Sequence, residues 1–339
     1  MMMQPAKRFT AWILFSLLLT IPLANADVTQ RADVNTFIER MVNEHQFERD
    51  YLVKTFKKVK TDPSVIEAIT RPAEAKPWHE YRPIFLTEDR IREGVKFWRQ
   101  NAGHLQRAYE TYGVAPEIIV AIIGVETKYG KHKGKYPVIG ALTTLAFDYP
   151  PRSQFFEKEL VEFLLLAREE KANPLSFKGS YAGAMGKPQF ISSSYRRYAV
   201  DFDGDGKRDL LNSVVDTIGS VANYFAQHNW YKDEPIVAPA KINGEDFKPV
   251  LEKGIKPYLE LGELLKNGVS IEEKKTPSLL TSLIQLELEK GHEYWVAFHN
   301  FYVITRYNHS ELYAMAAYQL GQEIKRFRFV GPRKPSGNS

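Results

Sequence analysis

Apolar residues recur at helical spacing along the first two thirds of the chain, where strand-like alternation is missing. Between residues 27 and 100, Phe37, Met41 and Val42 mark one helical face, and Leu52 and Phe56 mark another. The same spacing continues over residues 88–112, 116–129, 153–171 and 216–228. The pattern predicts a mainly α protein in which residues 27–100 form a small helical lobe and residues 101–229 form the central domain.

The pattern changes after residue 229. Prolines and turn glycines interrupt short segments over residues 230–297, at Pro235, Pro239, Pro249, Pro257, Pro277, Gly244, Gly254 and Gly268. This composition predicts a small β-containing insertion. Helical spacing returns over residues 298–330 and completes the central domain, whereas residues 331–339 are expected to be disordered. The predicted fold class is therefore mainly α with a small β part, that is α+β.

The N-terminus has the features of a secretion signal. Lys7 and Arg8 precede an apolar run over residues 11–23, and the small residues Ala24 and Ala26 follow it. That run has 13 residues, whereas a membrane-spanning helix needs about 20. We therefore expect residues 1–26 to be cleaved, and the mature protein to be periplasmic with no stable membrane anchor.

Composition excludes several classes of site. The chain has no cysteine, so it can form no disulfide, zinc-thiolate site, cysteine nucleophile or lipid-modified N-terminal cysteine. The formal charge of +5 includes Lys7 and Arg8, and cleavage after residue 26 would leave a mildly basic protein. No dense Lys/Arg stripe is present, and we expect no nucleic-acid partner. The His-Glu-x-x-His, Gly-x-Ser-x-Gly and phosphate-loop motifs are also missing.

One carboxyl group lies where its pKa should be raised. Residues 116–130 are apolar on every side, which predicts a buried helix that begins at Pro116 and ends at Gly130. Glu126 falls in the last turn, where the helix dipole and poor solvation both disfavour the charged form. A glutamic acid that stays protonated near neutral pH suits a general acid in glycoside cleavage. The alternative is a glutamate that emerges into solvent at the helix end.

Residues 179–190 are rich in glycine and alanine, which allow close approach of backbone or ligand. Ser180, Gln189 and Phe190 supply the hydroxyl, amide and aromatic groups that hold sugars. A tightly packed helix junction is the alternative interpretation. Further aromatic residues are candidates for a sugar cleft, although core packing is the default for each: Tyr81, Tyr181, Tyr195, Tyr198, Tyr224, Trp230 and Tyr307.

Residues 201–209 have the spacing of a calcium-binding loop. Side-chain oxygens fall at positions 1, 3 and 5, glycine at 6, a backbone carbonyl at 7 and an acid at 9, that is Asp201, Asp203, Asp205, Gly206, Lys207 and Asp209. Position 12 is Asn212 instead of the usual glutamate, and Asp216 is the candidate replacement. We predict a structural Ca²⁺ held weakly, with a dissociation constant of about 10⁻⁴ to 10⁻³ M. An acidic turn held by side-chain-to-backbone hydrogen bonds is the alternative.

Three segments of the chain together resemble the lytic murein transglycosylase B family, and the resemblance extends over about residues 34–322. Residues 124–130 (Gly-Val-Glu-Thr-Lys-Tyr-Gly) are similar to its catalytic stretch, residues 179–190 to its glycine-rich cleft motif, and residues 304–310 (Ile-Thr-Arg-Tyr-Asn-His-Ser) to its late cleft motif. The resemblance implies a lysozyme-like central domain flanked by a helical lobe and a small β domain. Some family members are lipoproteins, which a chain without cysteine cannot be.

The resemblance also implies roles for individual residues. Glu126 would be the catalytic acid, and Tyr81 and Tyr224 would be aromatic sugar contacts. Phe155 stands where a family member carries tyrosine, so ring packing could be kept while the hydroxyl is lost. The other cleft positions that match the family are Ser180, Gln189, Tyr307, Asn308 and Tyr313. The family's calcium loop matches Asp201, Asp203, Asp205, the carbonyl of Lys207, and Asp216 as closing ligand.

The implied reaction cleaves the β-1,4 bond between N-acetylmuramic acid and N-acetylglucosamine without water and gives 1,6-anhydromuramoyl ends. A hydrolytic muramidase of similar fold and a non-catalytic cell-wall glycan-binding protein are the alternatives. We expect a monomer that acts on peptidoglycan strands, with cell-wall synthesis proteins as the candidate class of protein partner.

Overall fold

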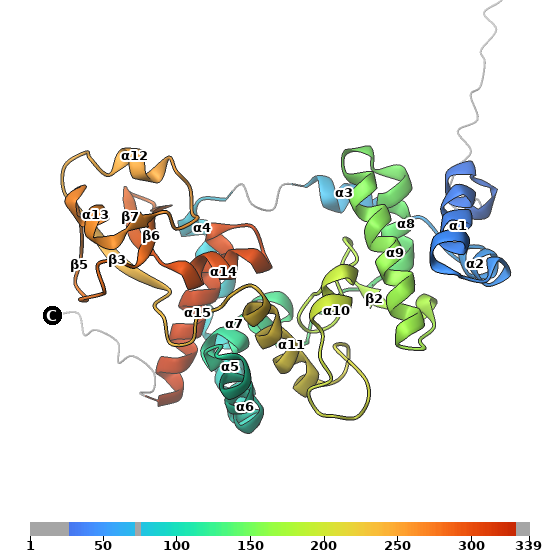
Figure 1. Cartoon of the computed structure of the whole chain (residues 1–339), viewed down its shortest axis with the longest axis horizontal. Helices are drawn as coiled ribbons and strands as arrows, with labels where there is room; N and C mark the ends of the chain where they lie inside the picture. The colour runs from blue at the N-terminus through green and yellow to red at the C-terminus, as the bar shows by residue number, and fades with distance from the viewer. Residues whose placement is uncertain (1–26, 72–75, 330–339) are drawn as a thin grey trace, which may run out of the picture.

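The fold is described for residues 27–71 and 76–329, and is taken from a computed structural model. The predicted signal peptide at residues 1–26 and the predicted tail at residues 331–339 lie outside the described residues. Helices make up most of the chain, and one antiparallel sheet lies at the opposite end of the molecule from α1 and α2 (Figure 1). The predicted α+β class is confirmed.

The first helices pack at one end of the molecule (Figure 1). Helix α1 contacts α2, α3 contacts α8, and α8 packs along α9. Phe37 of α1 meets Phe147 of α8 edge to face, with ring centroids 5.9 Å apart. The elements at this end are η1 (Val28–Gln30), α1 (Ala32–His45), α2 (Arg49–Phe56), α3 (Pro63–Thr70), α8 (Val138–Asp148), η2 (Pro150–Arg152), α9 (Ser153–Glu169) and η3 (Pro174–Ser176).

The central helices surround α7, which contacts α5, α6, α11 and α15. Gly321 of α15 allows this approach, because a Cβ there would lie 2.9 Å from the carbonyl oxygen of Glu117 on α7. These helices are α4 (Trp78–Phe85), α5 (Glu88–Gln100), α6 (Ala102–Tyr112), α7 (Pro116–Thr127), α10 (Ser192–Tyr198), α11 (Val214–Gln227), α14 (His299–Tyr307) and α15 (Glu311–Phe329). The pattern over residues 88–112 is divided at Asn101 into α5 and α6. Helices α4 and α5 pack on α15, away from α1 and α2, while the domain boundary at residue 100 stays a prediction.

A five-stranded antiparallel sheet with the order β4-β6-β7-β3-β5 lies inside the predicted insertion. Its strand β6 alternates between two cores: Leu283 packs in a small cluster with Val250 and Leu264, whereas Ile284 and Leu286 join the main core. The sheet therefore packs on the helical body through one of its faces. Its elements are β3 (Val237–Ile242), α12 (Lys248–Leu251), β4 (Leu259–Glu260), α13 (Leu261–Lys266), β5 (Val269–Ile271), β6 (Leu280–Glu287) and β7 (His292–Ala297).

In the described ranges, 27–71 and 76–329, no single helix is long and apolar enough to cross a membrane. Helices α6 and α7 pass that test of length and composition only when taken together, and a bend of 114° separates them.

A two-stranded antiparallel pair, β1 (Tyr136–Pro137) with β2 (Lys178–Gly179), sets the position of the glycine-rich segment. Gly134 precedes it with φ +91°, and a Cβ there would lie 2.0 Å from the carbonyl oxygen of Gly179. Both the backbone conformation and the space thus require glycine at this position.

We predict that Gly134→Ala lowers the free energy of unfolding by at least about 2 kcal/mol, because it adds a backbone clash and left-handed strain. Urea unfolding followed by circular dichroism measures this change. Gly103→Ala is the matched control: Gly103 is helical with open space around it, so alanine should stabilise the protein by about 0.5 to 1 kcal/mol. Equal effects of the two substitutions would contradict the packing described here.

Candidate active site

Glu126 lies in the last turn of α7, as predicted, and the chain leaves the helix abruptly after it. Lys128, Tyr129 and Gly130 have φ values of +49°, +60° and +89°. The amide of Lys128 donates to Gly124 O at 3.1 Å and that of Tyr129 to Ile123 O at 3.2 Å. This left-handed cap ends the helix directly after Thr127, and Glu126 is half-buried between the buried residues Val125 and Thr127.

Glu126 is half-buried as a residue, and its carboxyl is densely surrounded by protein. Burial raises its pKa to about 7, and the hydroxyl of Tyr313 opposes that rise by donating a hydrogen bond to Oε1 at 2.6 Å. No other carboxylate contributes to the shift. Glu126 therefore has an appreciable protonated fraction near neutral pH and a single donor that stabilises its charged form.

Two tyrosines from consecutive helices lie beside Glu126. Tyr307 ends α14, and Tyr313 is in the first turn of α15, where the hydroxyl of Ser310 accepts its backbone amide at 3.2 Å. Burial and the charge of Glu126 raise the pKa of both phenols well above the usual value. Asn308 lies in the turn between them. The tight turn at residues 308–310 thus brings both phenols to one carboxyl group.

The glycine-rich segment folds into a compact turn in which Met185 and Phe190 exchange two backbone hydrogen bonds, at 2.8 and 3.1 Å. Ser180 Oγ accepts the amides of Ala182 and Ala184 at 3.2 and 3.0 Å. Gln189 has φ +51°, and its Nε2 donates to Gly186 O at 2.9 Å. Both predicted polar residues therefore help to hold the shape of the segment, and their contact with sugar stays a prediction.

Lys187 is a functional candidate that the sequence did not indicate. It is only 8% exposed, and its Nζ donates to Leu211 O at 3.2 Å and to Asn212 O at 2.6 Å. Its own carbonyl accepts the hydroxyl of Thr127 at 2.8 Å, and burial lowers the pKa of its ammonium to about 8. Lys187 thus ties the exit of the acidic loop to the residue after Glu126. No spacing rule signals a buried lysine in a glycine-rich segment.

An aromatic cluster adjoins the Glu126 site. The ring of Phe190 lies 5.6 Å from that of Tyr224 and 5.8 Å from that of Tyr307, and the two tyrosine rings are 4.8 Å apart. Tyr307 donates its hydroxyl to Pro188 O at 2.6 Å. His228, which the sequence did not single out, stacks on Tyr224 at 4.2 Å. The structure therefore brings together three of the predicted cleft residues and adds an imidazole to them.

Two further predicted cleft residues are in different surroundings. Tyr81 of α4 is 7% exposed and lies close enough to Tyr313 to affect its pKa. Phe155 of α9 is 36% exposed, and its contacts are with the Phe156 ring at 5.0 Å and the Arg152 guanidinium at 4.3 Å. No contact in the described part of the chain joins Phe155 to the Glu126 cluster, so its role in binding stays a prediction.

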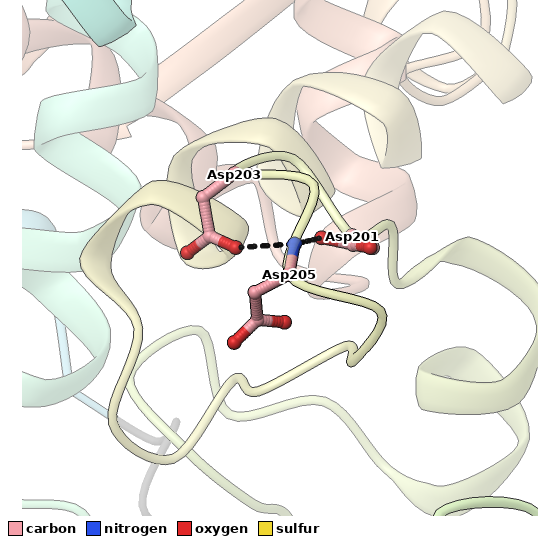
Figure 2. Close-up of side chains that lie close together, drawn as sticks. All are labelled: Asp201, Asp203 and Asp205. Carbon is pink, nitrogen blue, oxygen red and sulfur yellow. Dashed lines mark hydrogen bonds between the residues drawn. The ribbon is translucent and has the colours of Figure 1, made fainter.

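The acidic loop brings the carboxylates of Asp201, Asp203 and Asp205 together, with one oxygen of each lying within 4.8 Å of the others (Figure 2). Asp201 also accepts the amides of Gly204 at 2.7 Å and Gly206 at 2.8 Å. Within the described ranges, no lysine or arginine forms an ion pair with these three carboxylates. Such a set of like charges fits a hard cation that prefers oxygen ligands, as Ca²⁺ does.

Asp216, the predicted closing ligand, is buried in the first turn of α11. Its two oxygens accept the amides of Phe202 and Asp209, each at 2.8 Å. It therefore holds the two halves of the loop together through backbone amides. Coordination by Asp216 and by the carbonyl of Lys207 stays a prediction.

Comparisons with known proteins agree with this geometry. The chain matches the family model described as transglycosylase SLT domain over residues 29–322. It is 44% identical over 308 residues to the membrane-bound lytic murein transglycosylase B of Escherichia coli (strain K12), a match that covers 88% of this chain and 84% of that protein.

Several solved structures are similar to the chain, among them two lytic transglycosylases. Soluble lytic transglycosylase SltB1 from Pseudomonas aeruginosa has 50% identity and a TM-score of 0.83, and the match covers 87% of this chain and 99% of SltB1. The Escherichia coli lytic transglycosylase Slt35 in complex with calcium has 42% identity and a TM-score of 0.81, and the match covers 90% of this chain and 96% of Slt35.

These matches confirm the resemblance that three sequence motifs indicated, and they do not favour a hydrolytic muramidase or a non-catalytic binding protein. The family model and the relatives cover most of the described chain, including Glu126, the glycine-rich segment and both tyrosines of the α14–α15 turn. The chain therefore belongs to the transglycosylase SLT domain family, and it is a peptidoglycan lytic transglycosylase.

Proposed function

We propose that Glu126 acts as the single acid and base that cleaves the β-1,4 bond between N-acetylmuramic acid and N-acetylglucosamine. The observation that carries this proposal is the carboxyl of half-buried Glu126, whose pKa burial raises to about 7. A group that titrates near the working pH can both donate and accept a proton within one turnover. No neighbouring carboxylate affects its pKa, which supports a scheme with one carboxyl group.

In the first step, protonated Glu126 donates its proton to the glycosidic oxygen while the bond from that oxygen to muramoyl C1 breaks. The substrate's own acetamido oxygen stabilises the positive charge that develops at C1. N-acetylglucosamine leaves with the proton. Tyr313, which donates to Oε1 at 2.6 Å, then stabilises the Glu126 carboxylate that has formed.

In the second step, the Glu126 carboxylate takes the proton from the muramoyl C6 hydroxyl. The C6 oxygen attacks C1, the acetamido group is released, and a 1,6-anhydro ring closes. The carboxyl group returns to its protonated form, and no water is consumed. Buried Tyr313 and half-buried Tyr307 lie beside the carboxyl and would limit the access of water during this step.

The sugar rings would lie against the aromatic cluster, in which half-buried Tyr307 offers the most surface and Phe190 and Tyr224 are only 2% and 7% exposed. Tyr81 lies near Tyr313, on helix α4, which packs against α15. It is proposed to contact sugar as well. The remaining proposed substrate contacts are Phe155, Ser180, Gln189, Asn308 and Tyr313.

We further propose that Asp201, Asp203 and Asp205 hold a structural Ca²⁺, together with the carbonyl of Lys207 and with Asp216 as candidate closing ligand. The solved relative Slt35 in complex with calcium supports this proposal. The ion would relieve the repulsion among the loop carboxylates, and Lys187 would transmit the order of the loop to the end of α7. The ion itself takes no part in proton transfer.

The cell compartment proposed is the periplasm, where peptidoglycan is accessible. Support comes from the N-terminal sequence pattern and from the match to an enzyme of murein cleavage. A monomer and contacts with cell-wall synthesis proteins stay predictions.

Digestion of purified peptidoglycan tests the reaction, with the released muropeptides analysed by mass spectrometry. We expect products about 18 Da lighter than those of hydrolysis, because ring closure replaces the addition of water. Glu126→Gln should lower the rate by at least about 10²-fold, since the acid and base are removed together. Reducing ends from the wild-type protein would contradict the non-hydrolytic step, and near-full activity of the variant would remove Glu126 from its role.

Melting temperature serves as the folding control for Glu126→Gln. The pKa of Glu126 is higher in the folded state than in the unfolded state, where it is 4.5. The protein's free energy of unfolding therefore falls as pH increases from 4.5 to about 7. The neutral variant avoids that loss, so it should be more stable than the wild type at pH 8, by up to about 3 kcal/mol, and similar to it near pH 4.

We predict a specific pH dependence of kcat/KM. Activity of the wild type should fall as pH rises through about 7, because the first step requires protonated Glu126. Tyr313→Phe removes a hydrogen bond that lowers the pKa of Glu126. The descending limb of the pH profile should therefore move to higher pH in this variant. The control is Tyr258→Phe: Tyr258 directly precedes strand β4 of the five-stranded sheet and is 41% exposed. A limb that stays in place or moves lower in Tyr313→Phe would contradict the described hydrogen bond.

We also predict that Ca²⁺ stabilises the protein. Adding about 10 mM CaCl₂ after chelation should raise the melting temperature by about 2 to 4 °C if the dissociation constant is about 10⁻⁴ to 10⁻³ M. Asp205→Asn should abolish the shift, whereas Asp246→Asn, at an exposed position outside the loop, should keep it. Melting curves that are identical with and without calcium in the wild type would overturn the metal site.

A further inference from the structure

Two arginines border the outer end of the aromatic cluster. Arg197 lies in the last turn of α10, with its guanidinium 5.4 Å from the ring centre of Tyr198. Arg306 lies in the last turn of α14, immediately before Tyr307, with its guanidinium 5.7 Å from the ring centre of Tyr302. Both arginines lower the pKa of His228, so both charges lie near the same imidazole.

The aromatic rings between them form a continuous wall that leads toward Glu126. Tyr198 meets Tyr224 edge to face at 4.9 Å and lies 5.1 Å from His228. His228 stacks on Tyr224 at 4.2 Å, and Tyr224 in turn contacts Tyr307 at 4.8 Å. The phenol of Tyr224 donates to the backbone carbonyl of Arg306, so the main chain at this arginine is held against the same wall.

Hydrogen bonds to backbone also hold the wall in place. Asn223 donates to the carbonyl of Tyr198 at 2.9 Å, which ties the end of α10 to α11. His228 Nδ1 lies 2.7 Å from the carbonyl of Tyr224. The imidazole is half-buried, as is the phenol of Tyr198. The rings are therefore set in position before any ligand arrives.

Neither arginine has a carboxylate partner among residues 27–71 and 76–329. Arg306 has only a long contact of 3.5 Å to the hydroxyl of Tyr302, although it is half-buried. The neighbouring arginines behave differently: Arg196 pairs with Glu162 and Glu169, and Arg208 pairs with Glu169 and Glu170. Arg197 is exposed and Arg306 is half-buried, so an anion that approached them would meet guanidinium groups that are not already paired with carboxylates.

We propose that Arg197 and Arg306, with the wall of Tyr198, His228 and Tyr224, form a subsite for a carboxylate carried by the muramoyl substituent of the glycan. The inference rests on the proposed function, because the sugar bound near Glu126 brings the substituent to this wall. The carboxylate belongs either to a stem peptide or to the free lactyl group of a strand without peptides. Guanidinium groups bind carboxylates through charge-assisted hydrogen bonds, and aromatic faces pack against sugar rings.

The subsite would explain selection of muramoyl glycans over neutral ones. A chitooligosaccharide offers the same ring faces and acetamido groups but no carboxylate. It would therefore contact the wall and leave both guanidinium groups without a partner. Discrimination by the pair of arginines is then a property of binding, separate from the proton transfers at Glu126.

Isothermal titration calorimetry in the Glu126→Gln background tests the proposal, since ligands are then not consumed. The three ligands are a soluble peptide-bearing glycan, the same glycan after an amidase has removed its peptides, and a chitooligosaccharide. We expect Arg306→Gln and Arg197→Gln each to raise the dissociation constant of at least one carboxylate-bearing ligand by about 10-fold or more. Neither should change chitooligosaccharide binding, and Arg306→Lys should restore part of the lost affinity. Arg99→Gln, at an exposed position of α5, is the matched control.

The pattern of losses identifies the source of the carboxylate. Loss for the peptide-bearing glycan alone assigns the subsite to the stem peptide, and loss for the peptide-free glycan assigns it to the lactyl group. Equal loss for all three ligands would show that the arginines only maintain structure, and no loss for any ligand would show that they are solvated surface groups. Either result overturns the proposal. Digestion by the wild-type protein, measured in parallel, separates these results from a failure of the proposed reaction itself.

Discussion

The rest of the site depends on one unfavourable placement, that of an ionisable carboxyl at the end of an entirely buried helix. Helix α7 has the central helices on every side, and its last turn holds Glu126 where burial raises the pKa to about 7. The cost of placing a carboxyl there is met only while it stays protonated or has the donor Tyr313. The same constraint that makes the residue reactive also makes it a source of pH-dependent instability.

The surrounding structure limits the movement of that carboxyl. The left-handed cap over residues 128–130 stops α7, and the hydroxyl of Thr127 bridges the cap to the carbonyl of Lys187. Lys187 then reaches the exit of the acidic loop, whose two halves are held by Asp216. The acidic loop therefore stabilises the site through backbone groups, at a distance from the reacting atoms.

The aromatic cluster gives the site a direction. From Glu126 it continues through Tyr307 and Tyr224 to His228 and Tyr198, where the Arg197 guanidinium lies 5.4 Å from the Tyr198 ring centre. A neutral, ring-lined section next to the carboxyl and a cationic section farther out match a substrate that alternates apolar ring faces with acidic substituents. The five-stranded sheet packs on the helices through the face of β6 that carries Ile284 and Leu286. Its strand β7 is followed by α14, which carries Arg306 and Tyr307.

The sequence by itself determined the features that depend on local order. An apolar run from Pro116 predicted a buried helix with Glu126 in its last turn, and the spacing of Asp201, Asp203 and Asp205 predicted that their carboxylates would converge. Proline and glycine spacing predicted where helices would give way to strands. Only the tertiary structure decided which groups meet: Tyr313 reaches Glu126 across 187 positions of sequence, and Lys187 is buried against the loop exit. It also decided that Arg306 has no carboxylate partner among the described residues, whereas Arg208 pairs with Glu169 and Glu170. Helical and strand periods fix which face a residue occupies, but the partner across that face is set by packing, which no local pattern contains.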